Sequence, residues 1–322
     1  MPTPPFNVLA ADFLEDASVE QSVFGDSVRL VMAKAMHESE LAPHLPETEG
    51  ILLFHDIEKI GEASFSLAPK LKCVVRAGVG YNNVDLHAAA RHGVIVCNVP
   101  DYGSEEVADH AIMFMLALAR RMVICHEYIR AGSWDFSPAL GTPRLRGKTF
   151  GVVGCGRIGT ATALRAKAFG MDVVFFDPYQ PTGLDKALGI RRVFDLGELL
   201  EQSHFVSLHC YLDEGSRKLI DAKAIARMKP GSYLINTARG PCVDEKALMD
   251  ALDSGHIEGA ALDVVEHEPL ADDRLRHHPK VLLTPHSAFY SAEGYVELRT
   301  KAAQEVLRIL KGEKPRNPVV AS

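Results

Sequence analysis

The stretch that decides the fold is residues 149–179, TFGVVGCGRIGTATALRAKAFGMDVVFFDPY. Its first five residues, 149–153, are apolar and partly β-branched, which predicts a buried strand. Residues 160–169 carry alanines and a leucine at helical spacing and end at Gly170, a common helix stop. Residues 172–176 predict a second strand. Strand, glycine-rich turn, helix and strand in this order are typical of a dinucleotide-binding βαβ unit.

Three glycines in the turn, Gly154, Gly156 and Gly159, match the pattern G-x-G-x-x-G. The first permits a tight turn, the second lets the backbone approach a pyrophosphate, and the third lets the helix lie close to the sheet. The phosphates would bind free N–H groups at the helix N-terminus, so Arg157 and Ile158 join the expected cofactor contacts. The alternative is an ordinary crossover with glycines at its turns. The strand, the helix and the acid that follow favour a cofactor site.

Asp177 closes the second strand and selects the cofactor. A carboxylate here accepts hydrogen bonds from the ribose hydroxyls of NAD and repels the 2′-phosphate of NADP. The next residues, Pro178 and Tyr179, offer no arginine for that phosphate. Arg191 and Arg192 lie further on, and a reach from either of them stays open. The sequence therefore favours NAD.

Composition excludes several classes of protein. The 322 residues predict two domains, and 47% hydrophobic with 24% charged residues predict a sizeable core. A net charge of −7 without a basic block gives no electrostatic support for nucleic-acid binding. The six cysteines are scattered without a C-x-x-C pair, which suits a reducing cytoplasm. We expect no signal peptide, because the N-terminus has no basic region followed by an apolar one, and no membrane span, because the longest apolar helical run, 111–119, is too short.

We also expect no metal site. Three histidines fall in a charged loop without metal-ligand spacing, and we expect them to be solvated: His267, His277 and His278.

Strand-like runs alternate with helical segments along the whole chain, which predicts parallel sheets built from right-handed crossovers. The glycine loop should follow the first strand of its own domain, so the long segment before it forms a separate α/β domain. The predicted fold is therefore α/β, with two Rossmann-like or flavodoxin-like doubly wound parallel sheets and a cleft between them. Outside the stretch 149–179, the strands are expected near 7–12, 28–32, 50–54, 73–77, 94–98, 205–209, 233–236, 259–263 and 281–284.

Two long helical segments mark the domain boundaries. Residues 104–122 predict a helix that crosses into the nucleotide domain, and residues 291–312 predict an amphipathic helix that returns to the first domain. We therefore expect an NAD-binding Rossmann domain at 102–290 and a substrate-binding catalytic domain made of 1–101 plus 291–322.

Polar residues follow three of the later strand-like runs, and ligands in open α/β sheets bind beyond the carboxyl ends of strands. Arg239 lies in TARG, Glu268 in EHEP and His286 in TPHSA. Taken singly, each has an ordinary explanation: a salt bridge at a strand end, a loop acid, or a core histidine. Together, downstream of a dinucleotide fingerprint, they predict one site.

These three side chains suit hydride transfer between a nicotinamide cofactor and a 2-oxo acid. The planar guanidinium of Arg239 can bind the substrate carboxylate and carbonyl. His286 can supply the proton, because imidazole exchanges protons near neutral pH. The carboxylate of Glu268 would orient the ring and favour its charged form.

The segments GVVGCGRIG, NTARG, ALDV…EHEP and TPHSA resemble the D-isomer-specific 2-hydroxyacid dehydrogenases over nearly the whole chain. The resemblance implies that Arg239, Glu268 and His286 are catalytic. It also implies that Asp263 lies near the nicotinamide amide, and we place Thr237, which begins TARG, in the cofactor-binding set with it.

The same resemblance implies a flavodoxin-like first domain, completed by the C-terminal helix, and a homodimer that pairs the NAD-binding domains. It further implies that residues 76–85, RAGVGYNNVD, form the substrate loop, where N–H groups of Val79 and Gly80 hold the carboxylate. We expect Arg76 and Phe289 to set substrate specificity. Arg76 would favour an anionic or polar substrate end, and Phe289 an apolar one; their alternatives are a salt bridge and core packing.

Within the family, ALRAKAFGMDVVFFDPY, HSAFYS and VDEKAL resemble the C-terminal-binding protein branch, whose animal members are corepressors that retain the fold. Phe289 stands where those proteins carry tryptophan, and their long tails have no counterpart here. Two classes stay open: an NAD-dependent D-2-hydroxyacid dehydrogenase and an NADH-sensing scaffold with weak catalysis. Among enzymes, phosphoglycerate dehydrogenase, glyoxylate or hydroxypyruvate reductase and reductases of bulkier 2-oxo acids compete.

Overall fold

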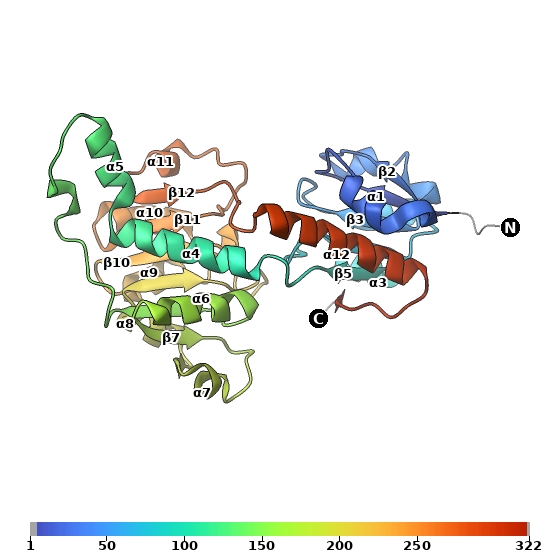
Figure 1. Ribbon diagram of the computed structural model, residues 1–322. Coiled ribbons are helices and arrows are strands. Elements are labelled where there is room, and N and C mark those ends of the chain that lie inside the picture. Colours follow the sequence, from blue (N-terminus) through green and yellow to red (C-terminus); the bar gives the residue numbers. More distant parts are fainter. Residues whose placement is uncertain (1–4, 321–322) are drawn as a thin grey trace. The chain divides into compact units, whose positions relative to one another are not determined.

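The structure is a computed structural model that describes residues 5–320, and it consists of two α/β units (Figure 1). The terminal unit comprises residues 5–103 and 291–320, and the central unit comprises residues 104–290. Each unit has one sheet, and all strands are parallel except one short edge strand in the terminal unit. The predicted fold class, two doubly wound parallel sheets, is confirmed.

The sheet of the terminal unit has the order β13-β5-β4-β3-β1-β2. Its first five strands in chain order give the flavodoxin-like arrangement 2-1-3-4-5. β13 pairs antiparallel with β5 at the edge. The strands are β1 (Phe6–Ala10), β2 (Val28–Met32), β3 (Gly50–Leu53), β4 (Cys73–Arg76), β5 (Ile95–Asn98) and β13 (Pro318–Val319).

Four α-helices belong to the terminal unit: α1 (Ser18–Phe24), α2 (Glu62–Leu67), α3 (Leu86–Arg91) and α12 (Ala292–Leu310). The long helix α12 packs against α1, β3 and β4, so the end of the chain completes the unit that the beginning forms. Arg299 of α12 donates to the buried carboxylate of Glu20 on α1 at 2.8 Å, and this pair fixes the contact between the two helices.

The sheet of the central unit is fully parallel, with the order β12-β11-β10-β9-β6-β7-β8. This is the Rossmann order, and the strand order reverses between β6 and β9. The first strand, β6, leads into the glycine loop. The strands are β6 (Thr149–Val153), β7 (Asp172–Phe176), β8 (Arg191–Val193), β9 (Phe205–Leu208), β10 (Ser232–Asn236), β11 (Ile257–Leu262) and β12 (Val281–Leu283).

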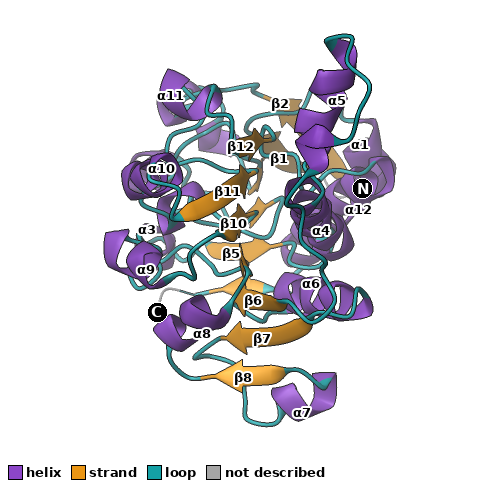
Figure 2. Cartoon of the chain, turned by 90° about the vertical axis from the view of Figure 1, so that its left-hand side faces the viewer, coloured by secondary structure: helices purple, strands orange, loops and turns teal. Residues whose placement is uncertain are grey.

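Helices cover both faces of this sheet (Figure 2). α8, α9, α10 and α11 lie over one face, and α4 and α6 lie over the other, each above its own buried apolar cluster. The helices are α4 (Ser104–Ala119), α5 (Met122–Arg130), α6 (Arg157–Ala168), α7 (Leu184–Leu188), α8 (Leu196–Gln202), α9 (Ala222–Arg227), α10 (Glu245–Asp253) and α11 (Asp273–Arg276).

Short 3-10 turns connect some of these elements: η1 (Gly25–Ser27), η2 (Glu38–Leu41), η3 (Leu45–Glu47), η4 (Ser137–Ala139) and η5 (Gly240–Cys242). The helix expected over 104–122 is interrupted. α4 ends at Ala119, Arg121 takes a left-handed φ of 50°, and α5 begins anew at Met122. Within residues 5–320, none of the helices combines the length and the apolar character that a membrane crossing requires.

Candidate active site

The glycine loop joins β6 to α6, and its glycines serve three different purposes. Gly154 has φ 89°, and a Cβ atom there would lie 2.8 Å from the backbone nitrogen of Cys210. A Cβ on Gly159 would lie 2.0 Å from the carbonyl oxygen of Gly154, so α6 begins tight against the loop. Around Gly156, by contrast, no atom lies within 4 Å of such a Cβ. The loop therefore presents its backbone to open space beside the first turn of α6, where Arg157 and Ile158 lie and N–H groups lack helical partners.

Asp177 is buried at the end of β7, and both of its carboxylate oxygens bind the backbone. Oδ2 accepts from the N–H of Cys155 at 2.8 Å, and Oδ1 accepts from the N–H of Tyr179 at 2.9 Å. Each oxygen keeps capacity for a second donor. The side chain thus braces the glycine loop and can still accept hydrogen bonds from ribose hydroxyls.

Arg192 lies next to Asp177 but is directed at backbone oxygens. It donates to the carbonyl oxygen of Asp177 at 2.6 Å and to that of Pro181 at 3.2 Å. Its guanidinium also lies over the rings of Phe175 and Phe194, 5.7 and 5.0 Å from their centroids. These contacts hold the Arg192 side chain against β7 and the turn that follows it.

Thr237 gives a further test of whether the residues present fit NAD. The residue is 8% exposed, and its hydroxyl is buried without a hydrogen-bond partner among residues 5–320. A buried hydroxyl without a partner is costly, and a bound ligand can supply that partner. Together with the open face at Gly156 and the acceptor capacity of Asp177, this hydroxyl fits a dinucleotide at the carboxyl edge of the sheet.

Arg239, Glu268 and His286 follow β10, β11 and β12, which are neighbours in a parallel sheet, so all three lie at the same edge. His286 Nδ1 lies 2.7 Å from Glu268 Oε2. The other carboxylate oxygen of Glu268 accepts from the N–H of Val265 at 3.2 Å. Burial tends to raise the pKa of Glu268, but the hydrogen bond and charge of His286, aided by Val265 and Arg239, bring its pKa below the usual value. The carboxylate is therefore ionised at neutral pH.

The turn that carries Arg239 is shaped by the buried side chain of Asn236. Its amide donates to the carbonyl oxygen of Arg239 at 2.9 Å and its oxygen accepts from the N–H of Ala238 at 2.9 Å. The Arg239 guanidinium donates back to the carbonyl oxygen of Ala238 at 2.7 Å. The motif N-T-A-R-G is thus a turn held by hydrogen bonds among its own residues, and these bonds fix the backbone from which the Arg239 side chain extends.

The loop that carries His286 is held by Asp263, which is 3% exposed. One carboxylate oxygen accepts from the hydroxyl of Thr284 at 2.5 Å and from the N–H of Ser287 at 2.9 Å, and the other accepts from the N–H of Ala288 at 3.0 Å. The backbone oxygen of Asp263 also accepts from the N–H of His286 at 2.8 Å. Sequence reasoning assigned Asp263 only to the cofactor and missed this second task.

The central unit matches a family model described as "D-isomer specific 2-hydroxyacid dehydrogenase, NAD binding domain" over residues 112–288. The chain belongs to the D-isomer-specific 2-hydroxyacid dehydrogenase family. The prediction of NAD as the cofactor is confirmed at the level of this domain.

Individual relatives agree with this assignment. The chain is 36% identical over 95% of its length to D-3-phosphoglycerate dehydrogenase of Bacillus subtilis, and 35% identical over 94% to C-terminal-binding protein 1 of Caenorhabditis elegans. It spans 57% and 43% of the lengths of these two relatives. The crystal structure of D-lactate dehydrogenase from Aquifex aeolicus with NAD and lactic acid matches with a TM-score of 0.88 and 31% identity, covering 98% of this chain and 100% of that one.

Phe289 lies beside His286. Its ring is half-buried and meets the His286 ring edge to face, with centroids 6.4 Å apart.

In the terminal unit, Arg76 ends β4, and its side chain lies over the predicted substrate loop: a Cβ on Gly78 would lie 1.5 Å from Arg76 Nη1. The loop is held by Asn98, whose amide donates to the carbonyl oxygen of Val79 at 2.7 Å. Gly80, the next residue, is half-buried.

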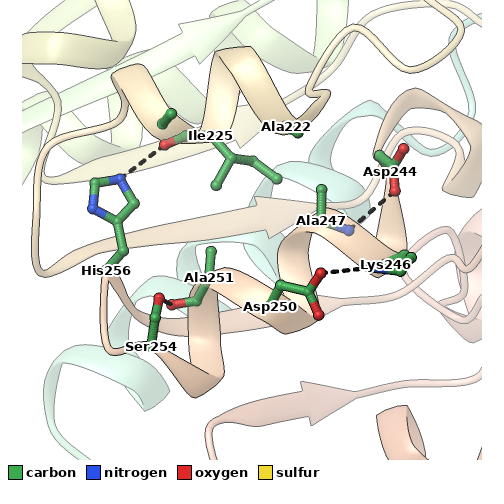
Figure 3. A pocket seen from close by; sticks show the side chains of 10 residues that line it. Ala222, Ile225, Asp244, Lys246, Ala247, Asp250, Ala251, Ser254 and His256 are labelled. Atoms are coloured by element: carbon green, nitrogen blue, oxygen red, sulfur yellow. Dashed lines mark hydrogen bonds and ion pairs between the residues drawn. The ribbon is translucent and has the colours of Figure 1, made fainter.

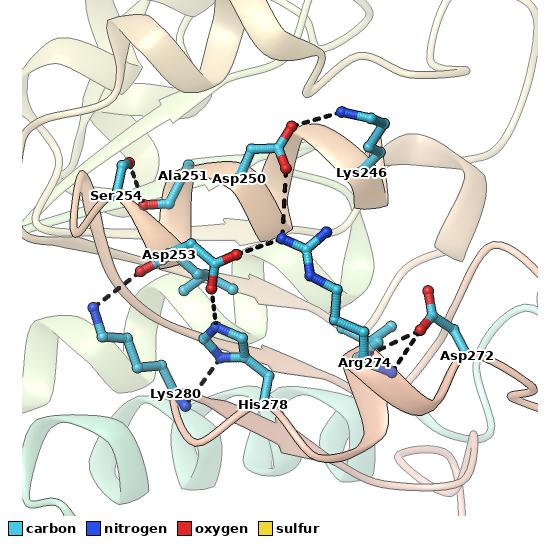
Figure 4. A network of polar contacts seen from close by, with 11 residues as sticks. Lys246, Asp250, Ala251, Asp253, Ser254, Asp272, Arg274, His278 and Lys280 are labelled. Atoms are coloured by element: carbon cyan, nitrogen blue, oxygen red, sulfur yellow. Dashed lines mark hydrogen bonds and ion pairs between the residues drawn. The ribbon is translucent and has the colours of Figure 1, made fainter.

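Two other polar features of the central unit lie outside the candidate site. A shallow groove of about 550 Å³ runs between α9 and α10, where His256 bonds to the carbonyl oxygen of Ile225 at 2.9 Å (Figure 3). None of the candidate catalytic residues lines it. Beside it, Arg274 of α11 pairs with Asp253 and, at 3.5 Å, with Asp250 (Figure 4). The side chain of His278, which we expected to be solvated, is 7% exposed and pairs with Asp253 at 3.2 Å, because it folds back onto α10.

Proposed function

We propose that the chain is an NAD-dependent oxidoreductase that interconverts a 2-oxo acid and a D-2-hydroxy acid. The observation that carries the proposal is the contact of 2.7 Å between His286 Nδ1 and Glu268 Oε2, at the same sheet edge as Arg239 and the glycine loop. It supplies an acid–base pair where a nicotinamide would lie.

NAD, when bound, supplies or accepts the hydride. The residues that would hold it are Gly154, Gly156, Arg157, Ile158, Gly159, Asp177, Thr237 and Asp263. The bracing bond from Cys155 N–H to Asp177 keeps the glycine loop in place for the diphosphate. We assign this NAD-binding role to residues 102–290, and the substrate-binding role to residues 1–101 plus 291–322.

Arg239 binds the substrate carboxylate through its planar fork and polarises the neighbouring carbonyl oxygen. His286 holds the proton. Its Nδ1 is engaged by Glu268, so Nε2 donates the proton to the substrate oxygen during reduction and accepts it during oxidation. The ionised Glu268 fixes the tautomer and stabilises the charged ring. The backbone N–H groups of Val79 and Gly80 share the carboxylate, and Arg76 and Phe289 bind the other end of the substrate.

His286→Ala tests the proposal. In this variant we expect turnover of 2-oxo acids with NADH to fall by about 10²- to 10⁴-fold, the range for loss of a general acid. Its Kd for NADH should stay within about twofold of the wild-type value, because the histidine acts on the substrate proton. A panel of glyoxylate, hydroxypyruvate, pyruvate and longer 2-oxo acids, with oxidation of 3-phosphoglycerate, would identify the substrate. Full turnover in the variant, or none by the wild type on the whole panel, would contradict the proposal.

The similarity to C-terminal-binding protein 1 favours a second candidate, an NADH-sensing scaffold with weak catalysis. The two candidates make different predictions. A scaffold binds NADH, turns over no member of the panel and captures peptides more tightly in the presence of NADH. The complete Arg239, Glu268 and His286 set makes the enzyme our first choice.

We further propose a homodimer formed through the NAD-binding domains. α5 has no buried residue, and the segment after it exposes large apolar side chains, with Trp134 86% and Phe136 77% exposed. Figure 1 shows α5 and this segment standing out from the rest of the central unit. Exposed apolar surface of this kind marks an interface. Light scattering should report a dimer, and Trp134→Ser with Phe136→Ser should weaken it.

All six cysteines are free thiols in this structure, which fits the cytoplasmic location that we propose.

A further inference from the structure

A chain of three polar side chains lies behind the loop that carries His286. It runs from His110 on α4 through Thr284 after β12 to Asp263 after β11. His110 Nε2 lies 2.9 Å from Thr284 Oγ1, and Thr284 Oγ1 lies 2.5 Å from Asp263 Oδ1. The side chains of His110 and Asp263 are 15% and 1% exposed. The chain thus links a helix on one face of the sheet to the sheet edge that holds the candidate site.

The direction of these hydrogen bonds follows from counting protons. A threonine hydroxyl has one hydrogen, and Thr284 donates it to Asp263, which as a carboxylate can only accept. Thr284 must therefore accept from His110, so the His110 ring carries a proton on Nε2. Burial lowers the pKa of His110, although the charge of Asp263 opposes this, so the ring is a neutral donor at neutral pH. The ring of Phe114 packs edge to face against it at 4.6 Å and restricts its rotation.

Asp263, which is held by Thr284, is hydrogen-bonded in turn to the loop that carries His286. Its side chain accepts from Ser287 and Ala288, and its backbone oxygen accepts from His286. His286 itself has φ 52°, a left-handed conformation that is unfavourable for a residue with a Cβ. Such a conformation persists only where its surroundings hold it. Asp263 accepts hydrogen bonds from Thr284 before His286 and from Ser287 and Ala288 after it, and these bonds keep His286 in this conformation.

We propose that His110 is a positioning residue for the reaction proposed above. It fixes Thr284, and through Thr284 it fixes Asp263, so that the loop keeps His286 in the left-handed conformation that directs its ring toward Glu268. The proposal rests on the proposed function for its catalytic consequence. It makes its own claim about how the loop is held.

Matched variants at His110 and Thr284 test this positioning role. His110→Phe keeps the ring and removes the donor, whereas His110→Gln places an N–H the same number of bonds from the backbone as Nε2. Thr284→Val removes the hydroxyl at nearly constant shape, whereas Thr284→Ser keeps it. We expect Phe and Val to lower kcat by about tenfold or more, because small misplacements of a catalytic group are costly. The KM for NADH should change much less than kcat, because the glycine loop and Asp177 also hold the cofactor in the proposed function. Gln and Ser should recover most of the loss.

Amide hydrogen exchange, measured without substrate, separates this proposal from the proposed function. Exchange at Ser287 and Ala288 should be faster in His110→Phe and Thr284→Val than in the wild type, and near the wild-type rate in His110→Gln. If the wild type reduces no 2-oxo acid but this exchange pattern appears, the proposed function is wrong and the positioning role stands. Unchanged exchange in both apolar variants, or a Gln variant no better than Phe, would overturn the positioning role.

Discussion

A Cβ atom on Gly240 would lie 1.9 Å from the carbonyl carbon and oxygen of Val265. The loops that follow β10 and β11 therefore touch backbone to backbone at this point. Gly240 comes directly after Arg239, and Val265 donates its N–H to Glu268. The glycine of T-A-R-G is thus what allows the arginine and the glutamate to share one sheet edge.

Gly240→Ala should separate the two loops and lower kcat/KM on the order of 100-fold, because a displacement of about 1 Å near the reacting groups has that effect. The measurement is steady-state reduction of the best 2-oxo acid, with the melting temperature recorded alongside. Gly215→Ala is the matched control, since its nearest neighbour would be a side-chain oxygen at 3.4 Å and its φ is not left-handed. Equal activity of the two variants would show that this contact does not set the geometry.

Asp177 should enforce the preference for NADH. Asp177→Asn keeps an acceptor for the Cys155 N–H but removes the charge that repels a 2′-phosphate. We expect the ratio of kcat/KM for NADH to that for NADPH to fall by roughly tenfold or more, as for loss of a charged hydrogen bond. If the wild type already prefers NADPH, the argument from charge repulsion is wrong, and Arg192 becomes the residue to test.

The sequence predicted the fold well because most strands are buried and apolar. The sequence analysis missed two strands. β8 (Arg191–Val193) is a three-residue edge strand that begins with two arginines, and β13 (Pro318–Val319) has only two residues, one of them a proline. The break between α4 and α5 was also missed. Around Arg121 the sequence favours helix throughout. Arg121 nevertheless takes a left-handed φ, and its side chain donates to the carbonyl oxygen of Leu140 and to Glu258, contacts between distant residues that no local pattern predicts.

The candidate site could be predicted only where a motif marks it. The glycine loop and the residues Arg239, Glu268 and His286 carry recognisable spacing, and the structure places each of them at the end of a strand or in the loop after it. The contact between His110 and Thr284 joins residues 174 positions apart, so no local pattern could reveal it. The sequence signal was a histidine immediately before the apolar run 111–119, which is also compatible with ordinary packing.

His209 should make the fold sensitive to mild acid. Its Nδ1 is buried without a partner within residues 5–320, and burial lowers its pKa to about 3. In the unfolded chain a histidine titrates near pH ~6.5, so below that pH the unfolded state binds a proton that the folded state does not. Stability is therefore fully present above pH ~6.5 and falls, by up to ~1.4 kcal/mol per pH unit, as the pH drops toward about 3.

Urea unfolding between pH 7 and pH 4 checks this. His209→Gln can keep the contact to Ser207, which lies 2.8 Å from Nε2, and it cannot titrate. We expect the variant to show a shallower loss of unfolding free energy with falling pH than the wild type. His87→Gln, at an exposed position, should leave the slope unchanged. Parallel slopes for wild type and His209→Gln would mean that other groups account for the acid sensitivity.

Arg76 and Phe289 should favour different groups at the end of the substrate away from its carboxylate. Arg76 folds over Gly78 in the predicted substrate loop, where its charge favours a polar or anionic substrate end. Phe289 lies edge to face with His286, where it favours an apolar end by about 1–3 kcal/mol for a well-buried group. We expect Arg76→Ala to lose more activity on hydroxypyruvate than on a branched aliphatic 2-oxo acid, and Phe289→Ala to show the reverse. The measurement is kcat/KM of each variant on both substrates, with glyoxylate, which has no side chain, as the reference. Equal losses on all three would mean that neither residue selects the substrate, and specificity would then have to come from other side chains of the terminal unit.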